Sequence, residues 1–328
     1  MRAIRIHEYG GPEAMRLEEL PTPTPGPGQA LVRIHTAGVN FIDVYHRTGL
    51  YKLPLPLTLG QEAAGVVEAV GPGVTEVKVG DRVVNTGVQG TYATHALFPA
   101  DRLVPVPDGM DLSVAAALPL QGITAEYLAT TTYPLKPGDT CLIHAAAGGV
   151  GLLLTQIAKR RGATVIGTVS TAEKERLARE AGADHVVRYT EQEVPAEVQR
   201  ITGGVGVQVV YDSVGRTTFE GSLASLATRG MMVSFGQSSG PVPPIDIIKF
   251  GASGGGSLFL SRPSLKHYIR TREELLARMG DVLRWVSEGW LKVRIERAVP
   301  LTDAAQAHRL LESRATAGKV VVAVSGEG

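Results

Sequence analysis

The sequence predicts an α/β protein in two parts, a strand-rich domain and a doubly wound parallel sheet. Three observations lead to this fold class. Up to about Gln121, short alternating segments are separated by turn residues. From Thr140 to Ser261, apolar strands alternate with helical segments, as in a sheet with helices on both faces. A glycine-rich turn, Ala145–Gly151, joins the first of these strands to the first helix.

The first part of the chain contains short strand patterns. The segment 21–28 alternates proline with threonine and glycine, so it can form neither a helix nor a central strand. Short strands with regular turn signals favour a small barrel or sandwich. The expected strands are residues 2–7, 29–36, 65–70, 81–84 and 92–98.

Near Ser113 the pattern changes to helix, with Ser113 as the expected N-cap and a second helix at 124–131. Strands are then expected at 140–144, 164–168, 185–188, 207–211, 231–234 and 257–261, and helices at 150–161, 172–181, 194–202 and 217–226. In such a sheet, ligands bind at the carboxyl ends of the strands.

The tail after Pro263 contains two helical segments, 271–288 and 304–313, and two strand-like segments, 293–299 and 319–324. These elements would make a poor core by themselves. The tail is therefore expected to return to the first domain.

Composition excludes several classes of protein. A chain of 328 residues can bury a substantial core. The net charge of +1 requires neither a nucleic acid nor an anionic membrane as partner. Cys141 is the only cysteine, so no internal disulfide can form. No apolar run reaches membrane-spanning length, and the alternating start, Met1–Ile6, is unlike a signal peptide. A soluble, cytoplasmic protein is expected.

The glycine-rich turn carries the main functional signal. A strand, such a turn and a helix together place backbone N–H groups and a helix N-terminus against a pyrophosphate. The motif departs from G-x-G-x-x-G because Ala146 stands where the first glycine would be. The alternative is a tight strand-to-helix turn that binds nothing.

The residues after the second strand indicate which dinucleotide binds. An NAD site has an acidic residue about 20 residues past the turn, which accepts from the ribose 2′-OH. Here Gly167–Thr171 contains no Asp or Glu, and the hydroxyls of Ser170 and Thr171 with the ammonium of Lys174 suit a 2′-phosphate instead. NADPH is therefore favoured over NADH. Ser170 could also be a plain N-cap in a capping box with Glu173, and Lys174 a solvated lysine.

Zinc and nucleophilic chemistry are not expected. One cysteine excludes a Cys₄ zinc site, and the eight histidines show no metal-ligand spacing. Gln61 stands where a metal-binding histidine would be useful, in Gly60–Gly65. No activated nucleophile stands out, and no nucleophile elbow is expected.

Six motifs together resemble the zinc-independent quinone oxidoreductases, the zeta-crystallin-like group of the medium-chain dehydrogenase/reductase superfamily. The resemblance covers essentially the whole chain. The motifs are residues 37–45, 60–65, 79–83, 145–151, 210–215 and 261–265.

This resemblance implies a GroES-like β-rich catalytic domain, residues 1–122 and 263–328, around a Rossmann domain, residues 123–262, that binds NADPH. It implies NADPH in an interdomain cleft and a homodimer through an edge strand at Leu258–Leu260. It also places Asn40 and Gln61 where zinc-containing relatives keep metal ligands, so no metal is expected.

The resemblance further implies the site residues. Asn40, Tyr45 and Tyr51 are the expected catalytic residues. The expected cofactor contacts are Asn40, Phe41, Ile42, Asp43, Thr124, Gly148, Gly149, Val150, Ser170, Lys174, Tyr189, Ser213, Phe235, Ser238, Phe259 and Arg314.

Simpler interpretations of single site residues stay open. Tyr45 and Tyr51 could be core aromatics, Asp43 a solvated turn residue, and Arg314 a helix-end cation.

The expected function is NADPH-dependent reduction of quinones or related α,β-unsaturated carbonyls without a metal. Because no Lewis acid is available, the acceptor must itself be electrophilic. Tyr45 or bulk water would donate the proton. One alternative is an enoyl-thioester or alkenal reductase of the same superfamily. Another is a non-catalytic NADPH-binding protein, crystallin-like or RNA-binding, although the near-neutral charge disfavours nucleic acid.

Overall fold

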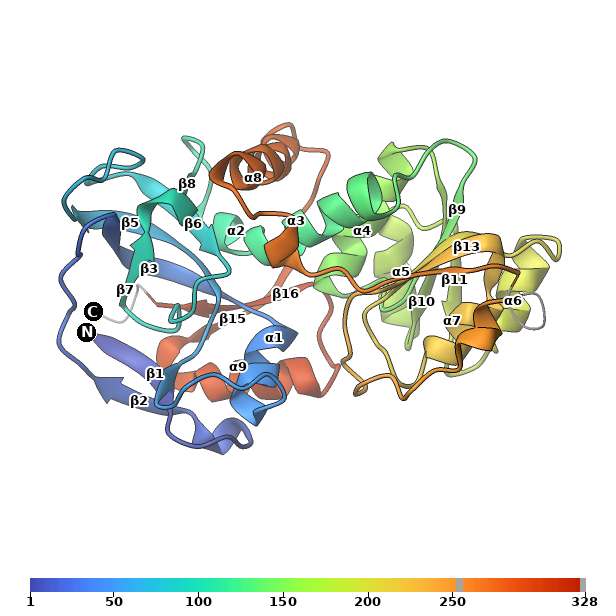
Figure 1. Cartoon of the computed structure of the whole chain (residues 1–328), viewed down its shortest axis with the longest axis horizontal. Helices are drawn as coiled ribbons and strands as arrows, with labels where there is room; N and C mark the ends of the chain where they lie inside the picture. The colour runs from blue at the N-terminus through green and yellow to red at the C-terminus, as the bar shows by residue number, and fades with distance from the viewer. Residues whose placement is uncertain (252–255, 325–328) are drawn as a thin grey trace. The chain divides into compact units, whose positions relative to one another are not determined.

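The computed structural model describes residues 1–251 and 256–324, and the chain divides into two compact units (Figure 1). Unit 1 consists of Met1–Ile123 and Tyr268–Gly328, and unit 2 of Thr124–His267. None of the helices in the described ranges combines the length and apolar character that crossing a membrane needs.

Unit 1 is built on two sheets. The smaller sheet has the antiparallel order β2-β1-β4, and the larger has the order β15-β16-β3-β5-β6-β8, with β7 also paired to β3. The bounds are β1 Arg2–Ile6, β2 Arg16–Glu19, β3 Gln29–Val39, β4 Leu57–Thr58, β5 Glu62–Val70, β6 Arg82–Thr86, β7 His95–Pro99, β8 Val104–Pro105, β15 Ile295–Pro300 and β16 Lys319–Ala323.

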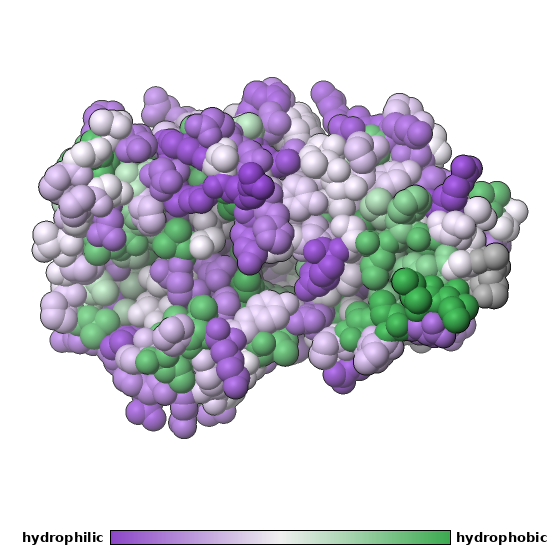
Figure 2. All heavy atoms as spheres, in the orientation of Figure 1, coloured by the Kyte–Doolittle hydropathy of each residue, from purple (hydrophilic) through white to green (hydrophobic). Residues whose placement is uncertain are grey.

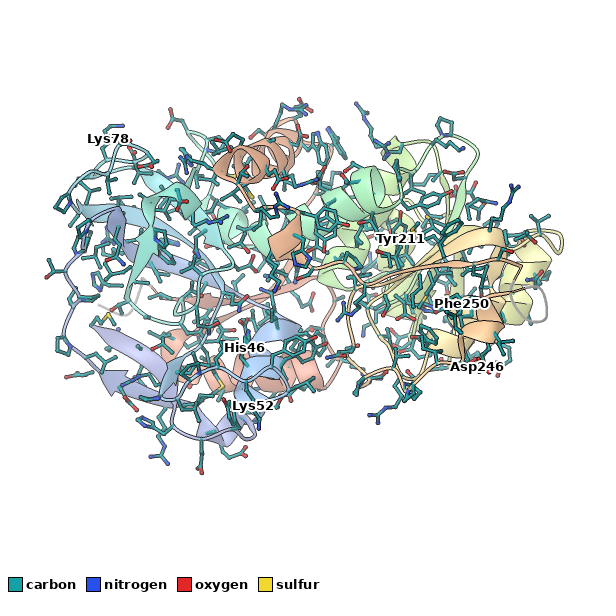
Figure 3. All side chains as sticks on the ribbon, viewed as in Figure 1. His46, Lys52, Lys78, Tyr211, Asp246 and Phe250 are labelled. Atoms are coloured by element: carbon teal, nitrogen blue, oxygen red, sulfur yellow. The ribbon has the colours of Figure 1, made fainter. Side chains whose placement is uncertain are left out.

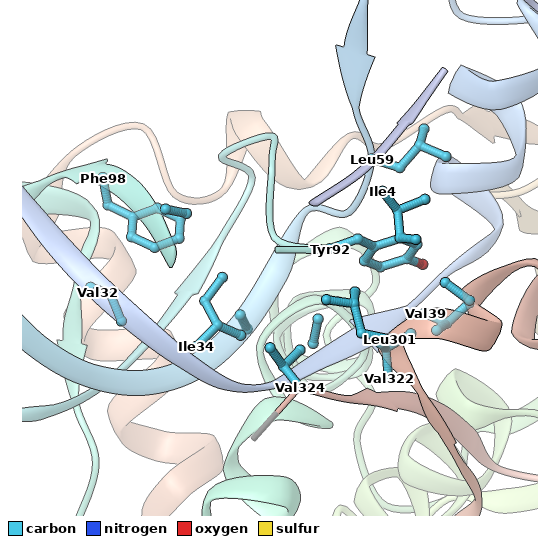
Figure 4. Packing of buried hydrophobic residues seen from close by; sticks show 14 of the residues in the cluster. Ile4, Val32, Ile34, Val39, Leu59, Tyr92, Phe98, Leu301, Val322 and Val324 are labelled. Carbon is cyan, nitrogen blue, oxygen red and sulfur yellow. The ribbon is translucent and has the colours of Figure 1, made fainter. Parts of the chain in front are cut away.

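The C-terminal tail enters the larger sheet. Strand β16 pairs antiparallel with β3, with Val320 opposite Val39, so the C-terminal tail shares a sheet with strands from the first part of the chain (Figure 1). They also share one core, in which Leu301 and Val322 from the tail belong to the same buried cluster as Ile4 and Tyr92 (Figure 4). This core fixes the position of β16 and of its first residue, Lys319.

The helices of unit 1 include one that the sequence patterns did not predict, α1, Phe41–Thr48. The others are α2 Leu112–Ala116, α8 Arg272–Ser287 and α9 Ala304–Glu312. The expected cap of α2 was wrong. Asp111, not Ser113, is the N-cap, because its carboxylate accepts from the backbone N–H groups of Ser113 and Val114.

Helix α3, Pro119–Tyr127, begins five residues before the expected 124–131 helix. Proline is well suited to a first helical position, where its missing N–H would have no acceptor. A π-helical segment, Leu128–Thr132, continues it. The boundary between the two units falls within α3.

Unit 2 confirms the doubly wound prediction. The six strands of its described residues are all parallel, in the order β11-β10-β9-β12-β13-β14. The strands are β9 Thr140–Ile143, β10 Thr164–Val169, β11 His185–Arg188, β12 Val207–Asp212, β13 Leu226–Ser234 and β14 Phe259–Ser261. The helices are α4 Gly149–Arg160, α5 Ala172–Glu180, α6 Val194–Ile201 and α7 Phe219–Ala224. The chain crosses to the other half of the sheet after β11, so β9 and β12 flank the switch point where such folds bind ligands.

Candidate functional site: a dinucleotide-binding edge and a polar cluster

The glycine-rich turn between β9 and α4 is tightly folded. Ala145 adopts a left-handed conformation, with a φ of 51°. The N–H of Gly148 donates to Ala145 O at 2.8 Å, and that of Ala146 donates to Thr168 O at 3.0 Å. Gly148 is the N-cap of α4, and the first N–H groups of a helix lack intrahelical acceptors. These N–H groups are suited to a phosphate.

Gly151 makes this turn sterically possible. A Cβ at this position would lie 2.3 Å from Ala145 O and 2.8 Å from backbone atoms of Ala146. The first turn of α4 therefore packs against the loop that precedes it, with no room for a side chain. This is the close backbone approach that dinucleotide-binding turns require.

Most predicted cofactor residues of unit 2 follow the carboxyl ends of adjacent strands. Because these strands are parallel, their carboxyl ends lie along one edge of the sheet. Backbone hydrogen bonds join the segments at the carboxyl ends of neighbouring strands: Tyr189 N donates to Val169 O at 3.1 Å, and Ser238 N donates to Ser213 O at 3.2 Å. The residues at this edge are Gly148, Gly149 and Val150 after β9, Ser170 and Lys174 after β10, Tyr189 after β11, Ser213 after β12, and Phe235 and Ser238 after β13.

The helix that follows β10 begins one residue later than the interpretation of Ser170 as its N-cap requires. Thr171, not Ser170, is the N-cap of α5, and its hydroxyl accepts from Lys174 N at 3.2 Å. The capping box between Ser170 and Glu173 is therefore wrong, because the cap lies one residue later. The segment 167–171 brings hydroxyl groups and no carboxylate to the end of this strand.

A buried hydrogen-bond network lies beneath the same edge, which the sequence patterns did not reveal. Asp212 Oδ2 accepts from the Ser222 hydroxyl at 2.8 Å, and Ser222 Oγ lies 3.0 Å from His144 Nε2. His144 Nδ1 lies 3.0 Å from Thr168 Oγ1. Burial lowers the pKa of His144, which favours the neutral imidazole. The network joins the carboxyl ends of β9, β10 and β12, so it stabilises the backbone next to the glycine-rich turn.

The sequence did contain a signal for this network. His144 directly follows β9, Asp212 ends β12, and these strands are neighbours in the sheet. Polar groups at the carboxyl ends of adjacent parallel strands come together.

Most of the predicted residues of unit 1 lie in α1 or next to it. Asn40 is its N-cap, and Phe41, Ile42 and Asp43 form its first turn. The Tyr45 ring lies 6.2 Å from that of Phe41 and 5.3 Å from that of Tyr51, between centroids. Tyr51 is 37% exposed and Tyr45 is half-buried, so neither is a fully buried core aromatic.

Asp43 is fully buried, so the interpretation as a solvated turn residue is wrong. Its Oδ2 accepts from the backbone N–H of Asn40 at 2.9 Å and from the hydroxyl of Tyr92 at 3.1 Å. Oδ1 is buried without a partner among the described residues. Burial raises the pKa of Asp43 to about 7; the Asn40 N–H opposes this, and the charge of Glu62 adds to it.

This shift predicts a pH effect on stability that Asp43→Asn should abolish. The folded carboxyl keeps its proton up to about pH 7, whereas the unfolded one loses it near 3.8. Between these values the folded state binds more protons, so the free energy of unfolding falls as pH rises. The wild type should lose about 2 kcal/mol more than the variant between pH 5 and pH 7, measured by urea unfolding. Parallel pH profiles for the two proteins would contradict the assignment.

Asn40 belongs to a buried polar cluster with Glu62, Gln121 and Lys319. Asn40 Oδ1 accepts from Lys319 Nζ at 2.8 Å and from Gln121 Nε2 at 3.2 Å. Asn40 Nδ2 donates to Glu62 Oε1 at 2.6 Å, and Glu62 Oε1 also accepts from Lys319. The ammonium group already neutralises the carboxylate and would repel a metal cation.

Gln61 and His46 lie beside each other (His46 is labelled in Figure 3). Gln61 Nε2 donates to His46 Nε2 at 2.8 Å, and His46 Nδ1–H donates to Tyr51 O at 2.9 Å. Burial lowers the pKa of His46, consistent with this neutral form. Within the described ranges, no group of three or more His, Cys, Asp or Glu side chains could hold a metal ion. Asn40 and Gln61 carry amides, and Asn40 lies beside the Lys319 ammonium, so the donor set at these two positions does not fit zinc.

Three predicted cofactor residues lie neither at the carboxyl-end edge of the unit 2 sheet nor at α1. Thr124 is buried on α3, Phe259 is exposed on β14, and Arg314 follows α9 in a left-handed backbone conformation, with a φ of 57°.

Comparison with known proteins defines the class. The family model described as Alcohol dehydrogenase GroES-like domain matches residues 26–108, and that described as Zinc-binding dehydrogenase matches residues 149–284. A GroES-like domain with a Rossmann-type parallel sheet is the architecture of medium-chain dehydrogenases/reductases, so the chain is an oxidoreductase of this superfamily.

Individual relatives show which family within this superfamily the chain belongs to. The chain is 45% identical to Quinone oxidoreductase 1 of Escherichia coli, over 96% of this chain and 97% of that protein. It is 43% identical to a 2-haloacrylate reductase of Burkholderia, over 98% of each. The structure of E. coli quinone oxidoreductase complexed with NADPH matches with a TM-score of 0.96 at 44% identity, covering 99% of this chain and 100% of that one. The chain belongs to the quinone oxidoreductase family.

Proposed function

We propose that this protein reduces quinones and related α,β-unsaturated carbonyl compounds with NADPH and without a metal. The proposal rests on the edge of the parallel sheet in unit 2 where the strands have their carboxyl ends. At this edge are the glycine-rich turn after β9 and the end of β10, which is followed by hydroxyl groups and no carboxylate. Relatives named quinone oxidoreductase, one of them solved with NADPH, support the same assignment.

The residues of this edge fit NADPH. The backbone of Gly148, Gly149 and Val150 would hold the pyrophosphate, and Ser170 and Lys174 the 2′-phosphate. Bound NADPH supplies the reducing equivalents for the reaction. The remaining proposed contacts are Asn40, Phe41, Ile42, Asp43, Thr124, Tyr189, Ser213, Phe235, Ser238, Phe259 and Arg314.

Asn40, Tyr45 and Tyr51 are the proposed catalytic residues of unit 1. Reduction of a quinone or an enone places negative charge on a carbonyl oxygen. An amide N–H of Asn40 is a donor that can stabilise this charge. Tyr45 or water then provides the proton. In the proposed metal-free reaction the acceptor must be electrophilic by itself, which favours quinones and enones over simple ketones.

A panel of acceptors tests the proposal. Purified protein should oxidise NADPH, followed at 340 nm, with at least one quinone or enone, and more slowly with NADH. Failure to oxidise NADPH with any member would overturn the proposal. The panel should include haloacrylates and enoyl thioesters, since a relative is named 2-haloacrylate reductase. Preference for those acceptors over quinones would favour the enone-reductase alternative.

We further propose that the protein is a homodimer through β14. This strand ends the order of the parallel sheet, and its Phe259 and Leu260 are 56% and 45% exposed. Ile247 and Ile248 add to the apolar patch, which Figure 2 shows over this part of unit 2. An exposed, apolar edge strand is suited to pairing with its own copy across a two-fold axis.

A charge placed on this edge should prevent association. Leu260→Asp is expected to sediment as a monomer at concentrations where the wild type is a dimer. Leu17→Asp is the matched control, because Leu17 is 40% exposed on β2, the edge of the smaller sheet. It should leave the dimer intact. A monomeric wild type, or a dimeric Leu260→Asp variant, would contradict the proposal.

The proposed location is the cytoplasm, where the buried thiol of Cys141 would stay reduced. No nucleic-acid partner is proposed. Binding of RNA that persisted at saturating NADPH would revive the non-catalytic alternative.

A further inference from the structure

Lys319 and Glu62 form a buried ion pair next to Asn40. Lys319 is 1% exposed, Glu62 is fully buried, and Asn40 is 3% exposed. The three residues come from the start of β16, the start of β5 and the N-cap of α1. Glu62 Oε2 also accepts from the backbone N–H of Leu120 at 2.6 Å, at the beginning of α3. Four separate segments of unit 1 therefore meet at one carboxylate.

The backbone is shaped to admit this carboxylate. A Cβ at Gly38, the residue two positions before Asn40, would lie 2.1 Å from Glu62 Oε1. Only glycine leaves space there. Burying an ammonium and a carboxylate together costs desolvation that their attraction barely offsets, so a pair of apolar residues could stabilise the fold equally well. The pair calls for a role other than stability.

The geometry of the pair determines how the Asn40 carboxamide is oriented. An ammonium group can only donate hydrogen bonds, and a carboxylate can only accept them. Lys319 therefore requires Asn40 Oδ1 on its side, and Glu62 requires Nδ2 on the other. If the amide were flipped, its Nδ2 donor would face the Lys319 ammonium and its Oδ1 acceptor would face the Glu62 carboxylate, so neither hydrogen bond could form. Gln121 Nε2 adds a second donor to Oδ1 and favours the same orientation.

In this orientation the two hydrogens of Asn40 Nδ2 differ. One donates to Glu62 Oε1, and the other has no partner among the described residues. The Lys319 ammonium at Oδ1 polarises the amide, which strengthens the remaining N–H as a donor.

We propose that Lys319 is a positioning residue for the reaction. Together with Glu62, it holds the Asn40 amide so that one Nδ2–H donates to the carbonyl oxygen of the acceptor. The lysine thereby supports, through Asn40, the negative charge that develops on that oxygen. This inference rests on the proposed function, since it assigns the donor for the proposed reduction.

The test removes both charges together. Lys319→Met with Glu62→Gln avoids leaving one charge buried alone, and Lys319→Arg retains the cation. The double variant should bind NADPH within about threefold of wild type but lose at least tenfold in kcat, while KM changes less. Lys319→Arg should recover part of that loss. Lys159→Met with Asp184→Asn removes a partly exposed 2.8 Å ion pair in unit 2 and should keep the wild-type kcat.

A cycle with Asn40→Ala separates positioning from structure. If Lys319 and Glu62 act through Asn40, adding Asn40→Ala to the double variant should lower kcat little further. Fully additive losses, or a double variant with wild-type kcat, would overturn the proposal. Wild-type protein inactive with every acceptor would instead refute the proposed function, so the two failures are distinguishable.

Discussion

Gly151→Ala is expected to raise the dissociation constant for NADPH at least tenfold. The new Cβ would lie 2.3 Å from Ala145 O, and backbone atoms cannot move aside as a flexible side chain can. The first turn of α4 must therefore shift away from the phosphate-binding position. A tenfold loss corresponds to about 1.4 kcal/mol of binding free energy. Titration of the quenching of protein fluorescence by NADPH measures it.

Gly280→Ala is the matched control for this substitution. Gly280 also lies inside a helix, α8, but a Cβ there meets nothing within 4 Å. Alanine should stabilise that helix by up to about 1 kcal/mol and leave NADPH binding unchanged. Equal NADPH affinities for Gly151→Ala and wild type would show that the turn does not hold the cofactor.

The sheet of unit 2 could be predicted closely because parallel strands are buried on both faces. Their apolar runs are continuous and contrast clearly with the helices between them. The same reasoning failed for β2, whose sequence Arg-Leu-Glu-Glu lies mostly exposed at a sheet edge. It failed also for α1, whose buried residues include Asp43, His46 and Arg47 beside Val44. A short helix that buries polar side chains is hard to recognise from apolar spacing alone.

Buried charged side chains of unit 1 have partners from distant parts of the sequence. Arg47 pairs with Glu312 on α9 at 2.8 Å, and Lys319 pairs with Glu62. Neither partner is identifiable from local patterns, because each pair depends on how β16 and α9 return to the N-terminal strands. The dinucleotide-binding edge was accessible from the sequence, since its residues directly follow predictable strands. The polar cluster around Asn40 required the tertiary structure.

Lys174→Ala is expected to remove most of the preference for NADPH over NADH. Lys174 lies in the first turn of α5, directly after the strand end that carries no carboxylate. A hydrogen bond from a cation to a phosphate contributes about 1.5–3 kcal/mol, so NADPH affinity should fall roughly ten- to hundredfold. NADH lacks the 2′-phosphate, and its affinity should change by less than about threefold. Isothermal titration with both dinucleotides measures the ratio.

The control for Lys174→Ala must remove a charge from the same helix without touching the phosphate. Arg176→Ala does this, because Arg176 is committed to surface ion pairs with Glu173 and Glu180. It should leave the ratio of the two affinities unchanged. The α5 cap should survive in Lys174→Ala, since Thr171 accepts from the backbone N–H of residue 174 rather than from its side chain. A fall in affinity for NADPH alone would therefore report the lost ammonium group. If the NADPH to NADH ratio of Lys174→Ala equals that of wild type, the 2′-phosphate is held elsewhere.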